Sequence, residues 1–217
     1  TVGGDYPDGT ECEGEFSEPV VCLLGLTTSS LDGAGEYRPP VDHDREVREA
    51  WSGSSSSVKR TLRYLLEDKM GLDSSDYVWW WQSEPHPGPD KAATAYSHSH
   101  PVIILDEAAT ASSAPEPTDP ETWRPVIAKH VSECEGAGWD AHRLERSVSV
   151  SRADEIGDIV GYVSEYLAVA PDEDLLERSD EYLLWAAAQF ASSTQKYSRS
   201  KWAVAAAQAD ACQQRYL

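Results

Sequence analysis

Four short segments of the chain have the composition of β-strands, and the stretches between them vary widely in length. The segments are residues 19–28 (PVVCLLGLTT), 77–84 (YVWWWQSE), 98–105 (HSHPVIIL) and 145–151 (ERSVSVS). β-Branched and aromatic residues are frequent in them, and turn-forming residues separate them from the rest of the chain. Because the segments do not recur at the spacing of βαβ units, the sequence predicts an α+β fold with a central, mostly antiparallel sheet flanked by helices.

Apolar residues at helical spacing occupy the chain between and after these strands. Helices are expected from about residue 44 to the Gly-Ser run at 52–57, over 58–70, 121–134 and 151–168, and twice within 172–217. Gly71 is a stop signal for the helix over 58–70. Ser151 and Asp154 form a capping-box pattern at the start of the helix over 151–168.

Composition divides the chain into three parts. Residues 1–18 are rich in Gly and acidic residues and predict a mobile tail. Residues 19–170 contain all the predicted strands and are expected to form the main domain. Residues 171–217 predict a helical extension packed on the same domain. The 217 residues suffice for one core with such an extension.

Acidic residues dominate the charge of the chain, with 38 Asp and Glu against 18 Lys and Arg and a formal net charge of −20. Acidic disordered chains share this excess, but eight Trp and ten Tyr favour a packed core here. A folded protein with this surface repels itself in dilute buffer and tolerates concentrated salt, which screens its charges. The sequence therefore predicts a halophilic source, in which general acidity says little against binding of nucleic acid.

The four cysteines form no C-x-x-C pair, and their spacing indicates neither a disulfide framework nor a zinc knuckle. They are Cys12, Cys22, Cys134 and Cys212. We interpret them as reduced thiols of a cytoplasmic protein. No secretory signal and no apolar run long enough to span a bilayer is visible, so we expect no association with a membrane.

Two histidines separated by one residue form the first candidate site. In a strand, residues i and i+2 point to the same face, so His98 and His100 would lie close enough to bind one metal ion. Glu84 ends the preceding strand candidate and reaches the same face if the two strands pair as a hairpin. Two imidazoles and one carboxylate suit a divalent ion with coordination positions left for substrate. The alternative is that both are surface histidines that bind no metal ion.

Two tyrosines four residues apart form the second candidate site. Tyr162 and Tyr166 (YVSEY) would project together from the predicted helix, because positions i and i+4 lie one above the other. A metal ion that polarises a phosphate would make a phenol an adequate nucleophile. The alternative is that both rings fill the core beside Ile159 and Val163.

The order of these features resembles the HUH family of rolling-circle replication initiators. The first family motif is a hydrophobic strand that ends in a Thr-rich turn, as in residues 23–28. The second is a histidine pair around one residue, as in His98 and His100. The third is a helix with one or two tyrosines, and GYVSEYLA is similar to the paired-tyrosine form of the bacteriophage gene A-type initiators. The segment 190–202 (FASSTQKYSRSKW) is similar to one that follows the third motif.

The resemblance covers most of residues 19–202 and implies the Rep protein of a small haloarchaeal plasmid or virus, with an HUH endonuclease-like fold. It implies that Glu84, His98 and His100 hold Mg²⁺ or Mn²⁺. Two positions depart from the family pattern. Ser99 stands where the family has a bulky apolar residue, and Glu165 stands where Y-x-x-K has its lysine.

The resemblance also implies a reaction. Tyr162 would attack single-stranded DNA at a replication origin, forming a 5′-phosphotyrosine link and a free 3′-OH for a host polymerase, and Tyr166 would act in a second round. A host helicase is a further expected partner. We assign DNA contacts to the basic residues Lys196, Arg199 and Lys201, which stand out from the acidic background. Two alternatives remain open: a related HUH transposase or relaxase, and a catalytically inactive DNA-binding or interaction module on the same fold.

Other residues gave weaker signals. Cys134 and His142 could form half of a zinc site, but no second half is visible and a structural role is preferred. His43 and His130 have no supporting motif. The three consecutive tryptophans at 79–81 could stack on bases. Side chains alternate between the two faces of a strand, so at least one of the three must face the protein core, and packing is the preferred interpretation.

Overall fold

The computed structural model of the chain describes residues 16–53, 57–85, 95–152, 178–192 and 197–200. The strands among them form one antiparallel sheet in the order β4-β1-β3-β2-β5. Their bounds are β1 Pro19–Leu24, β2 Tyr77–Pro85, β3 Ser97–Asp106, β4 Val148–Arg152 and β5 Tyr197–Arg199. The predicted α+β fold with an antiparallel sheet is confirmed.

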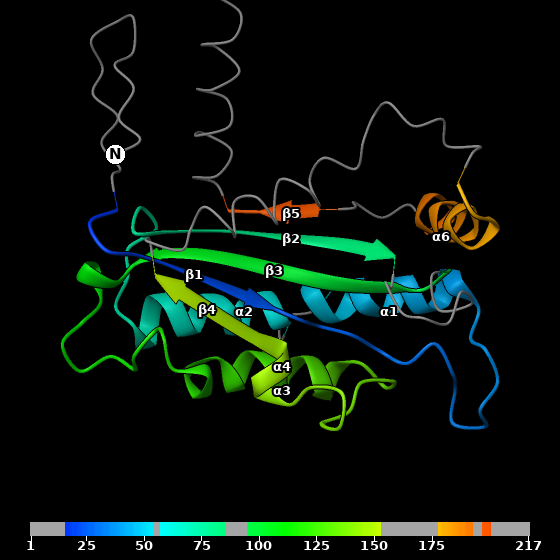
Figure 1. Cartoon of the computed structure of the whole chain (residues 1–217), viewed down its shortest axis with the longest axis horizontal. Coiled ribbons are helices and arrows are strands. Elements are labelled where there is room, and N and C mark those ends of the chain that lie inside the picture. Colours follow the sequence, from blue (N-terminus) through cyan, green and yellow to red (C-terminus); the bar gives the residue numbers. More distant parts are fainter. Residues whose placement is uncertain (1–15, 54–56, 86–94, 153–177, 193–196, 201–217) are drawn as a thin grey trace, which may run out of the picture.

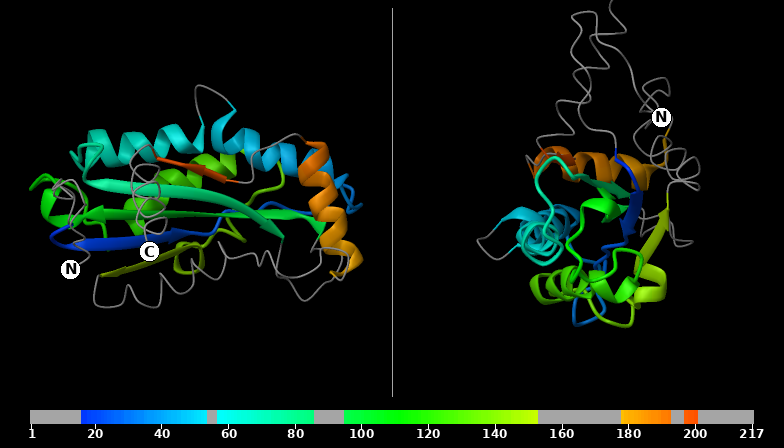
Figure 2. Two further views of the ribbon diagram at one scale, coloured as in Figure 1. Left: turned by 90° about the horizontal axis from the view of Figure 1, so that it is seen from above. Right: turned by 90° about the vertical axis from the view of Figure 1, so that its left-hand side faces the viewer.

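Helices cover one face of this sheet. They are α1 Pro40–Ser52, α2 Val58–Arg63, the π-helix η1 Tyr64–Lys69, α3 Arg124–Glu133 and α4 Leu144–Ser147, with 3-10 turns at η3 Glu107–Ala109 and η4 Pro120–Trp123. Figure 1 shows α1 to α4 beneath the sheet, and the end-on view in Figure 2 shows the same two layers. Helix α6, Asp180–Ala191, lies at one end of the sheet. No helix in the described ranges is long and apolar enough to cross a membrane.

The aromatic strand β2 alternates between the two faces of the sheet. Trp79 and Trp81 are buried on the face that carries the helices, where Trp51 of α1 contacts both. Its ring stacks on Trp81 at 5.6 Å between centroids and meets Trp79 edge-on at 5.5 Å. The burial of these two residues confirms the packing role expected for the tryptophan run. Large aromatic rings stabilise a fold mainly by leaving water.

The opposite face of the sheet, which we call the second face, carries a smaller apolar cluster. Val21 and Val102 are buried there, and Leu23, Trp80 and Ile104 are partly buried beside them. The alternation of strand residues assigns this face to even-numbered positions in β2 and β3. Trp80 therefore lies on the opposite side of the sheet from its two neighbours.

The last strand of the main domain begins later than predicted. The strand expected over 145–151 begins only at Val148, because residues 144–147 form the helical turn α4. The carbonyl of Ser147 at the end of that turn accepts a hydrogen bond of 2.8 Å from the amide of Gly25, just beyond β1. The alternating pattern predicts a strand correctly but does not contain the long-range contact that sets where it begins.

Helix α6 is one of the two helices expected within 172–217, and the Ala-rich stretch after residue 200 lies outside the described residues. Residues 197–199 form the strand β5, which pairs with β2 and was not predicted from the sequence. Strand β2 is nine residues long, and its outer edge carries backbone groups that need partners. Strand β5 supplies them, and the amide of Ser200 donates to the carbonyl of Trp79 at 2.9 Å.

Candidate metal centre

Three predicted ligands meet at the end of the β2–β3 pair. The register sets Glu84 directly opposite His98, and Gln82 opposite His100. Since His98 and His100 are two residues apart in β3, both imidazoles lie on the second face together with Glu84. One possible ligand atom from each of the three side chains lies within 4.8 Å of the others.

Both histidines direct the same ring nitrogen at the same carboxylate oxygen. His100 Nε2 lies 3.4 Å from Glu84 Oε1, and His98 Nε2 lies 3.9 Å from that atom. Ligand atoms that bind one divalent ion at about 2.1 Å are separated by roughly 3–4 Å, depending on the angle at the ion. The observed separations fit a shared ion, so the predicted group could hold a metal.

Burial makes this group suited to a cation. Glu84 and His98 are each 6% exposed. Burial raises the pKa of the Glu84 carboxyl to about 7, because removal from water disfavours its charged form. A divalent ion beside Glu84 would favour the charged carboxylate and so lower its pKa again. His100 is more accessible than the other two ligands, with its side chain 20% exposed, so substrate would approach the ion from its side.

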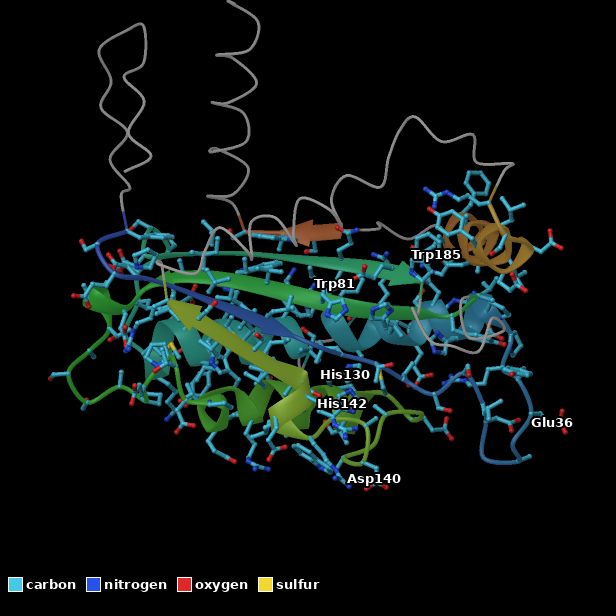
Figure 3. The ribbon with its side chains drawn as sticks, viewed as in Figure 1. Glu36, Trp81, His130, Asp140, His142 and Trp185 are labelled. Atoms are coloured by element: carbon cyan, nitrogen blue, oxygen red, sulfur yellow. The ribbon has the colours of Figure 1, made fainter. Side chains whose placement is uncertain are left out.

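Serines alternate with the ligands along both strands and face the other way. Ser97 Oγ donates a hydrogen bond of 2.8 Å to Oδ1 of the buried Asp44 in α1. Ser97 Oγ also accepts from Trp185 Nε1 of α6 at 3.1 Å (Figure 3). The residue next to His98 is thereby tied to two helices.

A second residue of α6 strengthens this attachment. Gln189 Nε2 donates to the Asp44 carboxylate, to Ser97 Oγ at 3.0 Å and to Ser83 Oγ at 3.4 Å. Ser192 Oγ donates to Asp44 Oδ2 at 2.7 Å. Ser83 precedes Glu84, so the strand ends that carry two ligands are both bonded to α6. We call Asp44, Ser83, Ser97, Trp185, Gln189 and Ser192 the α6 network.

Removing the carboxylate of the α6 network is expected to destabilise the protein. Asp44→Ala leaves the donors of Ser97, Gln189 and Ser192 without their common acceptor, at a cost of about 3 kcal/mol or more in the free energy of unfolding. Asp44→Asn keeps one acceptor oxygen and is expected to cost less. Urea denaturation of the three proteins measures the difference. Equal stability of Asp44→Ala and the wild type would contradict this role.

The remaining predicted site residues are less fully described. Tyr162, Tyr166, Lys196 and Lys201 lie outside the described residues. Arg199 belongs to β5, and its backbone pairs with Trp80. The structure therefore brings together the three predicted metal ligands, and it sets the backbone of one predicted DNA contact two strands away from β3.

Three buried histidines that the sequence left unexplained surround the Thr-rich turn after β1. His130 Nε2 lies 2.9 Å from the carbonyl oxygen of Thr27, and the amide of Thr27 donates to His142 Nε2 at 3.1 Å. His43 Nε2 lies 3.3 Å from the carbonyl oxygen of Thr28. Figure 3 shows His130 and His142 close together on the helix side of the sheet. No sequence motif indicates these roles, because the partners are backbone atoms far away in the chain.

The cysteines in the described ranges take no part in a disulfide. Cys22 and Cys134 are free and buried. Cys134 Sγ lies 3.7 Å from His130 Nδ1, and burial raises the pKa of its thiol to about 12. Cys134 and His142 both contribute to packing around the Thr-rich turn, which agrees with the structural role preferred from the sequence.

The buried histidines predict a loss of stability in acid. Burial lowers the pKa of His43 to about 4, against about 6.5 in an unfolded chain. The unfolded state thus binds more protons between these values, so the contribution of His43 is fully present above pH 6.5 and is lost as the pH falls toward 4. Between pH 7.5 and 5 the loss is about 2 kcal/mol.

A matched variant isolates this contribution from that of the many carboxylates. His43→Gln keeps a donor for the carbonyl of Thr28 but does not titrate. The wild type is expected to lose about 2 kcal/mol more than this variant between pH 7.5 and 5. Urea denaturation at the two pH values measures both proteins, and parallel losses would show that His43 is protonated in the folded state.

The chain is similar in sequence to a protein family and to two curated proteins. The family model described as "Putative rep protein (DUF1424)" matches residues 17–215. An "Uncharacterized 36 kDa protein" of Halobacterium sp. (strain GN101) is 26% identical over 194 residues, which are 83% of this chain and 53% of the relative. A protein of the same description from Halobacterium salinarum is 25% identical over 193 residues, with the same coverage.

The chain spans about half the length of these curated relatives. No solved structure matches it.

Proposed function

This chain belongs to the rep protein family whose model matches residues 17–215, and we propose that it is a metal-dependent tyrosine endonuclease of the HUH type. Its substrate would be single-stranded DNA at the origin of a replicon that multiplies by rolling-circle replication. The observation that carries this proposal is the group of Glu84, His98 and His100 on adjacent strands of an antiparallel sheet.

The three side chains offer two imidazole nitrogens and one carboxylate oxygen to a divalent ion. Glu84, His98 and His100 would hold Mg²⁺ or Mn²⁺, and the ion would supply positive charge against the charge that develops on a phosphate under attack. The protein keeps the two imidazoles and the carboxylate on one face, and DNA would approach on the side of His100, the most exposed of the three.

Tyr162 is the proposed nucleophile. Its phenol oxygen would form a bond to the phosphorus and lose its proton, and the bond from phosphorus to the 3′-oxygen of the preceding nucleotide would break. The products would be a 5′-phosphotyrosine link and a 3′-OH, which a host polymerase could extend with the help of a host helicase. Tyr166 would perform the same attack in a second round and release a circular strand.

DNA contacts are proposed for Lys196, Arg199 and Lys201. Arg199 is in β5, whose backbone pairs with β2 beside Trp80. Strand β2 also carries Glu84, so a basic segment at this edge would attract the phosphates that flank the scissile one. Such a local basic segment stands out against the net charge of −20.

A second candidate function is a DNA-binding module that does not cleave. Glu165 favours it, because a carboxylate stands where the resembled family has a lysine. The rep family favours a replication initiator over a related transposase or relaxase.

A nicking assay distinguishes these functions. Tiled single-stranded oligonucleotides from the replicon that encodes this chain are incubated with the protein, Mn²⁺ and KCl. The proposed endonuclease yields one cleaved oligonucleotide and a protein–DNA adduct that resists denaturant, and EDTA prevents both. Binding of an oligonucleotide without cleavage would instead identify the module, and it would refute the endonuclease.

The acidic composition predicts that stability depends on salt. At a net charge of −20, repulsion among surface carboxylates favours the unfolded chain, and salt screens that repulsion. The melting temperature is therefore expected to rise steadily as KCl is raised from 0.1 M into the molar range, where the Debye length is only about 3 Å. Thermal melting followed by circular dichroism measures it. A constant melting temperature would contradict the halophilic interpretation.

A further inference from the structure

Two imidazoles bind the two backbone polar groups of Thr27, its amide and its carbonyl. His142 Nδ1 lies 2.8 Å from the carbonyl oxygen of Gly138, which can only accept, so Nδ1 carries the hydrogen. His142 Nε2 then has a free lone pair, and the amide of Thr27 donates to it at 3.1 Å. His130 has the opposite tautomer, because its Nε2 must donate to the carbonyl oxygen of Thr27 at 2.9 Å. We call His130 and His142 the histidine clamp.

The histidine clamp is not itself arranged as a metal site. All four ring nitrogens have other partners, since His130 Nδ1 faces Cys134 Sγ at 3.7 Å. Burial lowers the pKa of His130 to about 4 and lowers the pKa of His142 as well, so both rings stay neutral. Their rings are 5.0 Å apart between centroids. Neutral imidazoles fixed by backbone atoms are suited to holding the chain in place.

Thr27 is next to the strand that carries the metal ligands. The pairing of β1 with β3 ends at Leu23 opposite Val102, but the same register continues to an isolated bridge of Leu26 with Ser99. Leu26 and Ser99 exchange two backbone hydrogen bonds of 2.9 Å each. Ser99 separates the two ligand histidines, and Thr27 follows Leu26 directly. Contacts that hold Thr27 therefore also hold the Leu26–Ser99 bridge, which lies beside His98 and His100.

We propose that His130 and His142 are positioning residues of the metal centre, which act through Thr27 and the Leu26–Ser99 bridge on the spacing of the ligand imidazoles. The proposal rests on the proposed function only in that the centre binds a divalent ion. Beyond Leu24 the segment lacks a continuous ladder to β3, so the Leu26–Ser99 bridge links it to the ligand strand. Gly25 and Thr28 have contacts of their own, with Ser147 and His43, and the clamp binds Thr27 between them. Without the clamp, the bridge would lose the support of the residue that directly follows Leu26.

The affinity for Mn²⁺ tests the proposal without any assay of DNA cleavage. His142→Phe keeps an aromatic ring, somewhat larger than imidazole, but cannot accept the hydrogen bond from Thr27, and it is expected to bind Mn²⁺ at least about tenfold more weakly. His142→Gln can both donate and accept, and it is expected to recover most of the affinity. Titration calorimetry, or the paramagnetic resonance signal of free Mn²⁺, gives the dissociation constants.

A core variant controls for a general loss of stability. Leu66→Ala removes a fully buried side chain of η1, away from the ligands, and should lower the melting temperature without weakening Mn²⁺ binding. If His142→Phe binds Mn²⁺ as the wild type does, or if Leu66→Ala weakens binding equally, the positioning role is refuted. Failure of the wild type itself to bind Mn²⁺ would refute the proposed function, and the positioning role with it.

The tautomers give a test that needs no folded variant. A long-range ¹H–¹⁵N spectrum of the wild type at pH 7.5 is expected to show His142 as the Nδ1–H form and His130 as the Nε2–H form. The same tautomer in both rings, or a protonated ring in either, would overturn the clamp even if His142→Phe did not fold.

Discussion

His98→Ala and His100→Ala are each expected to abolish Mn²⁺ binding and DNA nicking. Each substitution removes one of three proposed ligands, and loss of a ligand should exceed the roughly 10- to 100-fold effects of residues that only support ligands. The melting temperature should change less for His100→Ala, because the His100 side chain is 20% exposed whereas His98 is buried. Gln82→Ala is the matched control, because Gln82 lies opposite His100 on the same face but is outside the ligand group. Full nicking by either histidine variant would refute the metal assignment.

Glu84→Gln separates the charge of the third ligand from its shape. The amide has almost the same volume as the carboxyl group but no negative charge to hold a cation, so Mn²⁺ binding should again be lost. In the wild type, burial raises the pKa of Glu84 to about 7, so the metal-free protein loses stability as the pH rises from about 4.5 to 7. Glu84→Gln lacks this loss and should melt at a higher temperature than the metal-free wild type at pH 8.

The covalent adduct between protein and DNA is expected to disappear from the variant Tyr162→Phe/Tyr166→Phe. Replacing tyrosine by phenylalanine removes only the hydroxyl, so packing is nearly kept and the loss reports chemistry. If Tyr162 attacks first, Tyr162→Phe alone loses the adduct and Tyr166→Phe keeps part of it. Gel electrophoresis under denaturing conditions measures the labelled adduct.

Two other outcomes of that experiment are informative. The reverse pattern in the single variants would assign the first attack to Tyr166, which its position one helical turn later allows. An adduct formed by the double variant would exclude both residues. Tyr197 would then be the next candidate, since its backbone in β5 pairs with Gln82, the residue opposite His100.

The grouping of Glu84, His98 and His100 was predictable because strand alternation is a local property. His98 and His100 share a face in any extended strand, and Glu84 joins them once consecutive strands pair as a hairpin. The same alternation correctly indicated that the tryptophan run is divided between two faces. Nothing beyond the sequence of two neighbouring segments is needed for these conclusions.

The supporting residues could not be predicted, because their partners are distant in sequence. Trp185 and Gln189 reach Ser97 across about ninety residues, and His130 reaches Thr27 across more than one hundred. His130 bonds to backbone atoms of Thr27, which are the same for almost every residue type, so no pattern of side chains records the contact. Strand β5 forms for a similar reason, because the exposed edge of β2 selects it as a partner.

The position of β3 in the sheet has a consequence for its exchange with solvent. The strand that carries His98 and His100 lies between β1 and β2. Strand β2 pairs with β3 along its whole length, β1 pairs with it from Val102 to Asp106, and the Leu26–Ser99 bridge holds it between the two histidines. Local opening begins at chain ends and sheet edges, whereas amides of a central strand exchange hydrogen for deuterium mainly when the whole domain unfolds. The two imidazoles should therefore keep their spacing in the metal-free protein while the edges of the sheet open locally. A metal ion would then bind to side chains that are already in position.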